Sequence, residues 1–183
     1  MFIQTELTPN PSTLKFLPGR TVMPEGTANF TALDQAISSP LASRLFAVDG
    51  VCGVFLGSDF VSVTKDSAPE WDVMKPIILA AIMDHFTSGD AIIVEGATIG
   101  GHDGSDDDEI VSQIKELLET RVRPAVAQDG GDIIFRSFED GIVYLHMQGA
   151  CSGCPSSTAT LRNGIENMLR YYVPEVVEVR PAD

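Results

Sequence analysis

Apolar residues near the start of the chain alternate with polar ones in the manner of β-strands. Residues 2–7 and 14–17 show this pattern on either side of a proline-rich turn, which predicts two short strands. A second pair of apolar runs, 51–56 and 60–64, flanks the turn Gly57-Ser58-Asp59 and predicts a hairpin.

Two further stretches of the first half carry apolar residues at helical spacing. One covers residues 41–48 and follows a Ser-Pro pair that suits a helix cap and first turn. The other covers residues 71–86 and contains Pro76, which either kinks this helix or marks its first turn. The sequence of the first half therefore predicts two pairs of strands and two helices.

The composition changes abruptly at residue 96. Residues 96–108 are rich in glycine and acid, which predicts a flexible linker. At its end, Ser105 and Asp108 form a capping-box pattern for the helix that follows. We therefore divide the chain into an N-terminal domain of residues 1–95, the linker, and a C-terminal domain of residues 109–183.

The C-terminal domain begins with an amphipathic helix and continues with apolar runs 133–138 and 142–147 around a turn, a second hairpin. A helix over 156–172 and a short strand over 176–179 follow. The whole chain thus predicts an α+β protein of two small domains. Each is a short mixed or antiparallel sheet with helices packed on it, and an acidic, Gly-rich linker joins them.

The charge balance limits the expected partners and location. Acidic residues outnumber basic ones by 26 to 12, a net charge of -14, so the chain repels phosphates and no nucleic acid partner is expected. No apolar run reaches the roughly 18 residues that span a bilayer, so no membrane partner is expected. Residues 1–6 lack the features of a signal peptide, so the expected location is the bacterial cytoplasm, with no targeting segment.

Two of the three cysteines, Cys151 and Cys154, lie between the predicted strand 142–147 and the predicted helix 156–172. Three cysteines are too few for a secreted disulfide framework. A helix start presents unpaired N–H groups and the positive end of the dipole, so both sulfurs are expected as thiolates. The surrounding glycines and serines predict an exposed, tightly turned loop.

Four interpretations of these two thiols stay open. The first treats them as small buried hydrophobes. The second is a thiol-disulfide redox pair, although only 29 residues follow Cys154, too few for the rest of a thioredoxin-like fold. The third is a zinc site, which needs further ligands from His146 or from a second chain. The fourth is an iron-sulfur cluster shared between two chains, because such clusters usually take four thiolates and each chain offers two.

Several separated motifs resemble those of one family, the Nfu iron-sulfur scaffold proteins, in the family's order. The matching segments of the family's C-terminal NifU-like domain are residues 123–132, 149–157 and 161–166. The segments similar to the N-terminal domain of two-domain Nfu proteins are residues 8–16, 50–51 and 60–65. Together the two resemblances cover nearly the whole chain.

The resemblance implies a scaffold or carrier without enzymatic activity, which binds a [4Fe-4S] cluster and delivers it to apo iron-sulfur proteins. It makes Cys151 and Cys154 the cluster ligands. It also implies a homodimer on cluster loading and an upstream cluster-assembly scaffold as donor. A [2Fe-2S] intermediate and adventitious zinc stay open as other occupants.

The remaining cysteine and the histidines are given structural roles. Cys52 lies in the apolar run 51–56 and is expected to be a buried strand residue. His85 lies on the apolar stripe of the helix 71–86, and His102 lies in the acidic linker. His146 is the best histidine neighbour for the cysteine loop, but strand alternation can equally point it away.

Overall fold

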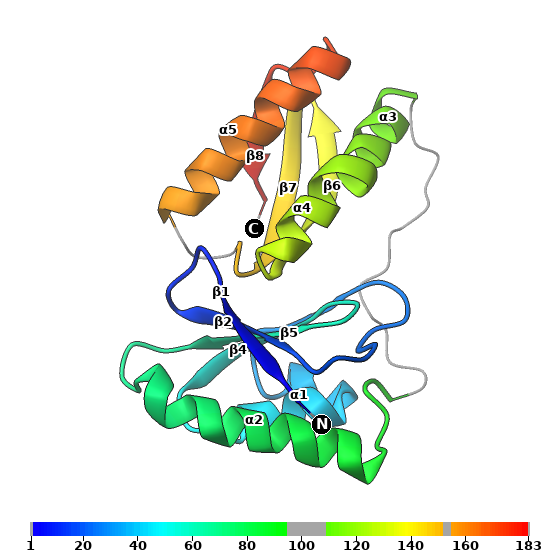
Figure 1. Cartoon of the computed structure of the whole chain (residues 1–183). Coiled ribbons are helices and arrows are strands. Elements are labelled where there is room, and N and C mark those ends of the chain that lie inside the picture. The colour runs from blue at the N-terminus through cyan, green and yellow to red at the C-terminus, as the bar shows by residue number, and fades with distance from the viewer. Residues whose placement is uncertain (1, 95–108, 152–154, 183) are drawn as a thin grey trace. The chain divides into compact units, whose positions relative to one another are not determined.

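The computed structural model describes residues 2–94, 109–151 and 155–182 (Figure 1). The chain divides into two compact units, Met1–Gly101 and His102–Asp183, and each is treated by itself. The predicted linker 96–108, with Ser105, Asp108 and His102, lies outside the described residues. Both units combine a sheet with helices, so the predicted α+β class is confirmed.

Unit 1 is built on an antiparallel sheet in the order β1-β2-β5-β4-β3. Figure 1 shows α1 and α2 on one face of this sheet. The predicted strand pairs and helices are all present. The elements are β1 (Gln4–Leu7), β2 (Thr13–Leu17), β3 (Ala28–Phe30), η1 (Gln35–Ser38), α1 (Pro40–Phe46), β4 (Val51–Leu56), β5 (Val61–Lys65) and α2 (Trp71–Ser88).

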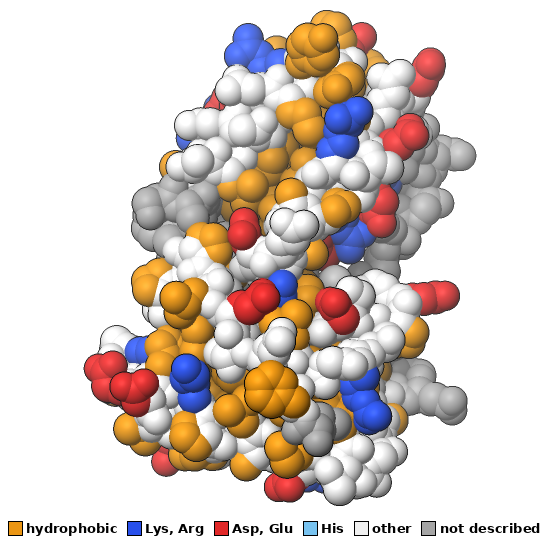
Figure 2. Space-filling model, viewed as in Figure 1, with side chains coloured by type: hydrophobic (Ala, Val, Ile, Leu, Met, Phe, Trp, Pro, Cys, Tyr) orange, Lys and Arg blue, Asp and Glu red, His pale blue; other side chains and the backbone are white. Residues whose placement is uncertain are grey.

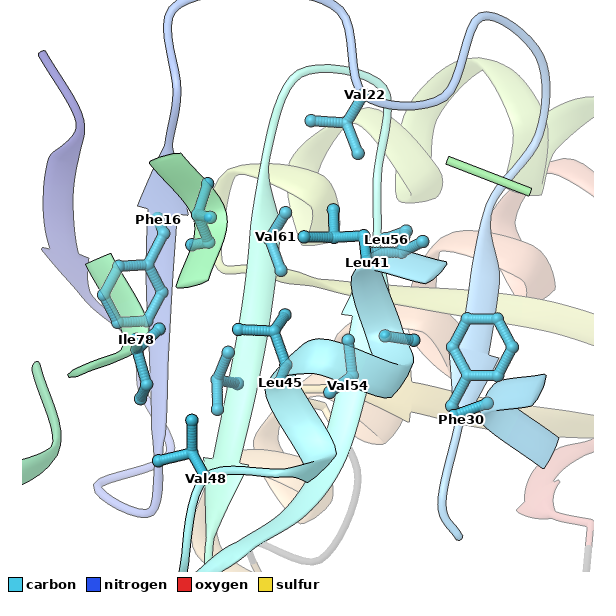
Figure 3. Close-up of a cluster of buried hydrophobic side chains, with 14 of the residues drawn as sticks. Phe16, Val22, Phe30, Leu41, Leu45, Val48, Val54, Leu56, Val61 and Ile78 are labelled. Carbon is cyan, nitrogen blue, oxygen red and sulfur yellow. The ribbon is translucent and has the colours of Figure 1, made fainter. Parts of the chain in front are cut away.

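The core of unit 1 forms where the helices meet the sheet. In Figure 3 Leu41 and Leu45 from α1 point toward Val54 and Val61 on the central hairpin, and Ile78 lies beside Phe16 on β2. Ser39 caps α1 because its Oγ accepts a hydrogen bond from Ala42 N at 3.2 Å. The same hydroxyl donates to Ile92 O at 2.6 Å and so ties the segment after α2 to α1.

Helix α2 resolves the question that the sequence left open at Pro76. The helix begins at Trp71, so Pro76 lies inside it and not in its first turn. The ring removes one backbone donor within the helix. The helix nevertheless continues to Ser88 because Met74, Ile78 and Ile82, on both sides of the proline, are buried against the sheet.

Unit 2 is built on a mixed sheet in the order β6-β7-β8, antiparallel between β6 and β7 and parallel between β7 and β8. Its helices cover one face of this sheet around one apolar core (Figure 1). The elements are α3 (Glu109–Leu117), η2 (Leu118–Val122), α4 (Arg123–Gln128), β6 (Gly131–Glu139), β7 (Ile142–Gly149), α5 (Pro155–Tyr172) and β8 (Glu178–Pro181).

Two details of unit 2 differ from the prediction. The expected single helix after residue 109 is interrupted by the π-helical segment η2, next to Pro124, which has no N–H to continue the regular ladder. The last strand begins at Glu178 and not at Val176, because Val176 still belongs to the turn after α5, where its N–H donates to Val173 O at 3.0 Å. Within the part of the chain that the structure describes, every helix is too short or too polar to cross a bilayer.

The ring of His85 on α2 is buried without a hydrogen-bond partner for either nitrogen among the described residues. It packs edge-on against Phe86, with ring centroids 5.5 Å apart. Burial and, less strongly, the charge of Arg44 on α1 lower its pKa, while Asp90 opposes them. The predicted packed histidine is confirmed, and the neutral ring is the form that the fold accommodates.

We expect this ring to make unit 1 sensitive to acid. Because the pKa is lower in the folded state, the unfolded chain takes up a proton first as the pH falls through its ordinary value of 6.5, and stability is lost below that pH. The variant His85→Leu should show a smaller loss between pH 7.5 and 5.5. At pH 7.5 it should gain about 1–3 kcal/mol, since an unsatisfied polar group is removed.

Trp71 is the single tryptophan and lies at the start of α2, so its fluorescence during urea unfolding follows unit 1 alone. Carboxylates titrate in both proteins, so the difference between the two pH curves isolates His85. Parallel curves for the wild type and His85→Leu would contradict this account.

Candidate metal centre

Cys151 lies two residues beyond the end of β7, beside the turn that joins α4 to β6. Gly149 at the end of β7 pairs with Gly131 at the start of β6. The next residue, Ala150, donates its N–H to Gly130 O at 3.2 Å. Gly130 and Gly149 have φ of 80° and 62°, which glycine adopts without strain. The ends of the hairpin thus bring the residues after β7 against the α4–β6 turn.

The thiol of Cys151 occupies the space that a side chain at Gly131 would take. A Cβ atom on Gly131 would lie 2.6 Å from Cys151 Sγ and 2.8 Å from Gln148 O. Both distances are far below van der Waals contact, and the second involves a backbone atom that cannot swing away. Gly131 is therefore required here for space, and it sets where the sulfur lies.

Cys151 is buried, with only 7% of its surface exposed, and it belongs to the apolar core of unit 2. Burial, and then the nearby carboxylates of Asp129 and Asp132, raise the pKa of its thiol to about 12. The expectation of an exposed cysteine favoured as a thiolate is therefore wrong for Cys151. Desolvation is the largest cause of this shift in the pKa of the thiol.

A partly buried ion pair holds the turn that carries Gly131. Arg123 at the start of α4 donates two parallel hydrogen bonds to Asp132, Nε to Oδ1 at 2.8 Å and Nη2 to Oδ2 at 2.9 Å. Its third nitrogen, Nη1, donates to Glu119 Oε2 at 2.6 Å. Hydrogen bonding to Asp132 raises the pKa of the guanidinium. Because Asp132 also accepts from Ile133 N at 2.8 Å, the buried carboxylate is well satisfied.

The structure places only part of the predicted site. Cys154 lies outside the described residues, so its pairing with Cys151 stays a prediction. Helix α5 begins at Pro155, one residue before the predicted start, and a proline suits the first turn because its missing N–H has no partner there in any helix. Among the described residues, no three His, Cys, Asp or Glu side chains gather closely enough to hold a metal ion.

The other candidates lie away from the cysteine loop. His146 alternates with the buried Leu145 and Met147, and its Nδ1 lies 3.4 Å from Ala182 O. It therefore faces away from the core that contains Cys151. Cys52 is on strand β4 as predicted but is exposed, so the prediction of a buried residue is wrong. The register of β4 and β5 shifts between Val51 and Gly53, and this bulge turns Cys52 outward.

Sequence reasoning missed Gly131, Arg123 and Asp132 as the support of Cys151. The available signal was the Gly130-Gly131 pair, two glycines followed at once by an acidic residue between a helix and a strand. Such a pair marks a close backbone approach, but it does not say which side chain fills the space.

Two family models match the chain. Residues 3–89 match "Scaffold protein Nfu/NifU N terminal", and residues 114–180 match "NifU-like domain". The chain is 52% identical over 177 residues to "NFU1 iron-sulfur cluster scaffold homolog, mitochondrial" from Homo sapiens, covering 96% of this chain and 70% of that protein. It is 55% identical over 181 residues to "NifU-like protein 4, mitochondrial" from Arabidopsis thaliana, covering 96% of this chain and 64% of that protein.

Among solved structures, the solution structure of a NifU-like protein from Saccharomyces cerevisiae has a TM-score of 0.42 and 25% identity, covering 52% of this chain and 86% of that chain.

The relatives correct one expectation. The prediction of a bacterial cytoplasmic protein is contradicted, because the similar proteins from Homo sapiens, Arabidopsis thaliana and Drosophila willistoni are all named mitochondrial. That prediction rested on the lack of a signal-peptide pattern in the first residues and on the small number of cysteines. The relatives are longer than this chain, so those residues do not decide the compartment.

The burial of Cys151 predicts unequal reactivity of two cysteines. In the metal-free full chain at pH 8, N-ethylmaleimide should modify Cys52 roughly tenfold or more faster than Cys151, because the first thiol is exposed and the second is buried. Burial raises the pKa of both thiols, but the shift is larger for Cys151, to about 12. Mass spectrometry of peptides gives the rate at each residue. In 6 M urea the two rates should converge. Equal rates in the folded protein would mean that Cys151 does not stay in the core.

The contact between Gly131 and Cys151 predicts the effect of one added methyl group. Gly131→Ala should destabilise unit 2 by about 1–3 kcal/mol, because the new Cβ overlaps Sγ and a backbone oxygen. It should also speed the alkylation of Cys151. The matched control is Gly164→Ala on α5, where an added Cβ meets nothing within 4 Å.

The control should be neutral or stabilise the helix by about 0.5–1 kcal/mol, since alanine is the better helix former. Urea unfolding followed by circular dichroism measures both variants. Similar behaviour of Gly131→Ala and Gly164→Ala would show that the space at Gly131 does not position the thiol.

Proposed function

The chain belongs to the Nfu/NifU family of scaffold proteins, and from this premise we propose that it carries an iron-sulfur cluster and transfers it to apo-proteins. The cargo is a [4Fe-4S] cluster bridged between two copies of the chain. Cys151 and Cys154 of each copy are its ligands. The observation that carries the proposal is the thiol of Cys151, held beside Gly131 at the base of a segment that leads to Cys154 and α5.

The number of donors supports a shared cluster. A cubane cluster usually takes four thiolates, and Cys52 lies on β4 of the other unit, on a strand that supplies no second sulfur. One chain therefore offers two sulfurs at the site, and a second copy related by a two-fold axis supplies the other two. In this proposal the protein is a homodimer when loaded.

The charges near Cys151 support a carrier more than a permanent cofactor site. A cluster held by four thiolates is anionic, and Asp129 and Asp132, whose carboxylates raise the pKa of Cys151, oppose added negative charge. Arg123 offsets only the second of these through its paired hydrogen bonds. These carboxylates weaken the binding of an anionic cargo and so favour its release.

The reaction of a carrier is ligand exchange, with no turnover of a small molecule. Thiolates of a recipient protein replace Cys151 and Cys154 one at a time, and each departing ligand regains a proton. The partners are apo iron-sulfur proteins as recipients and an upstream assembly scaffold as donor. A [2Fe-2S] intermediate and zinc are the alternative occupants that the same sulfur set accommodates.

The alternative is a thiol-disulfide redox protein that uses the same two cysteines. Reactive cysteines of that class are partly exposed and have a lowered pKa. Cys151 is buried and the pKa of its thiol is raised to about 12, so its surroundings do not match those of a redox-active cysteine.

Anaerobic reconstitution of the full chain with iron and sulfide separates the two functions. We expect a brown protein with about four irons per two chains, and a mass close to twice that of one chain in light scattering. Cys151→Ser and Cys154→Ser should lose the iron. Cys52→Ser is the matched control, because its exposed thiol lies on the other unit, and it should load fully.

Reduction of insulin disulfides by the metal-free protein would instead support the redox alternative. A loaded protein that stays a monomer, or equal iron in the wild type and Cys151→Ser, would contradict the shared cluster.

A further inference from the structure

Helix α2 of unit 1 is apolar on the side that faces the sheet and also on much of the side that faces away. Its inner row, Met74, Ile78 and Ile82, is buried in the core. The side that faces away carries five exposed apolar residues at helical spacing. We call them the outer row of α2: Val73, Pro76, Ile77, Ala80 and Met83.

The outer row is too exposed to belong to the core of unit 1. Val73 is 65% exposed, Ile77 51% and Met83 41%. Figure 2 shows apolar side chains on the part of the surface where α2 runs, with some charged side chains beside them. A surface helix normally carries charged or polar residues on this side, so the row is unusual for a helix with no partner.

The charges around the outer row are acidic at both ends. Asp72 precedes Val73 and Asp84 follows Met83, and both are exposed. The two aspartates are about 18 Å apart along the helix axis, at a rise of 1.5 Å per residue. Lys75 lies on the flank of the helix and is half-buried.

The negative charges of Asp72 and Asp84 at the two ends of the outer row decide whether a second copy of the chain or another protein fits it. If two copies of the chain paired through this row, each aspartate would lie beside an aspartate of the other copy, in parallel and in antiparallel orientation alike. Like charges across an interface cost binding energy, and each chain carries a net charge of -14. A partner that carries basic residues at the ends of an apolar row avoids both repulsions, because its charges attract the two aspartates and the acidic chain as a whole.

We propose that the outer row of α2 is a docking surface for an amphipathic helix of another protein, whose aliphatic row is bordered at both ends by Lys or Arg. The inference rests on the proposed function only for the role of this partner, as a donor or recipient of the cluster. Unit 1 then selects the partner, while the cysteines of unit 2 hold the cargo.

The probes are two helical peptides that share the same leucine row over about 15 Å and differ only in its borders, one with Lys and one with Glu. Fluorescence anisotropy of each labelled peptide with the full chain gives Kd. We expect the Lys-bordered peptide to bind about tenfold or more tightly than the Glu-bordered one. The variants Asp72→Asn and Asp84→Asn should narrow this difference, as should raised salt.

The matched pair of variants is Ile77→Gln and Ile37→Gln. Both replace an exposed isoleucine of unit 1, 51% and 75% exposed, and only the first lies in the outer row. Ile77→Gln should raise the Kd of the Lys-bordered peptide roughly fivefold or more, because less apolar area is buried on binding. Ile37→Gln should change this Kd less than about twofold.

Equal binding of the two peptides, or equal effects of the two substitutions, would overturn the proposal. So would a dimer of the metal-free wild type that Ile77→Gln abolishes, since a second copy would then be the occupant. Measuring how much iron each variant binds separates this proposal from the cluster hypothesis. Ile77→Gln should load iron like the wild type, whereas a wild type that fails to load refutes the carrier function and leaves the peptide result standing.

Discussion

The ion pair between Arg123 and Asp132 is the constraint on which the cysteine site depends. Asp132 is buried, and a buried carboxylate without a cation would cost several kcal/mol. The paired hydrogen bonds from Arg123 satisfy it and at the same time join the start of α4 to the start of β6. The turn between these elements carries Gly131, and the missing side chain of Gly131 leaves the space for Cys151. An ion pair thus helps to fix the position of the Cys151 sulfur through the turn that carries Gly131.

Much of the fold could be predicted because its elements carry local signals. The hairpin of β4 and β5 has two apolar runs around a glycine turn, and α5 has a regular apolar row after a proline. Strand β3, Ala28–Phe30, was missed because three residues are too few to show alternation, and it forms only by pairing with β4. The late start of β8 has a similar cause, since Val176 contributes to the apolar run but belongs to the turn before the strand.

The candidate site was less predictable, because its environment comes from residues distant in the sequence. Cys151 was expected to be exposed from its glycine- and serine-rich neighbours, but its burial depends on Gly131, twenty positions earlier. The prediction for Cys52 was wrong in the opposite direction, since this residue was expected to be buried and is exposed. The run 51–56 looks continuously apolar, while a bulge after Val51 reverses the outward and inward positions at its start. Spacing identifies which atoms can act as ligands, but burial and pKa depend on tertiary contacts.

The parallel pairing of β7 and β8 limits how far the cysteine segment can travel. Parallel neighbours require a crossover, and here α5 returns the chain along the length of the sheet, with Ile165 and Leu169 anchored in the core. Hydrogen bonds to β6 and β8 clamp β7 from both sides. Only five residues, 150–154, connect the end of β7 at Gly149 to the start of α5 at Pro155. Because β7 and α5 are both anchored in the core, the length of this five-residue connection limits how far the Cys151 sulfur can be displaced toward the surface.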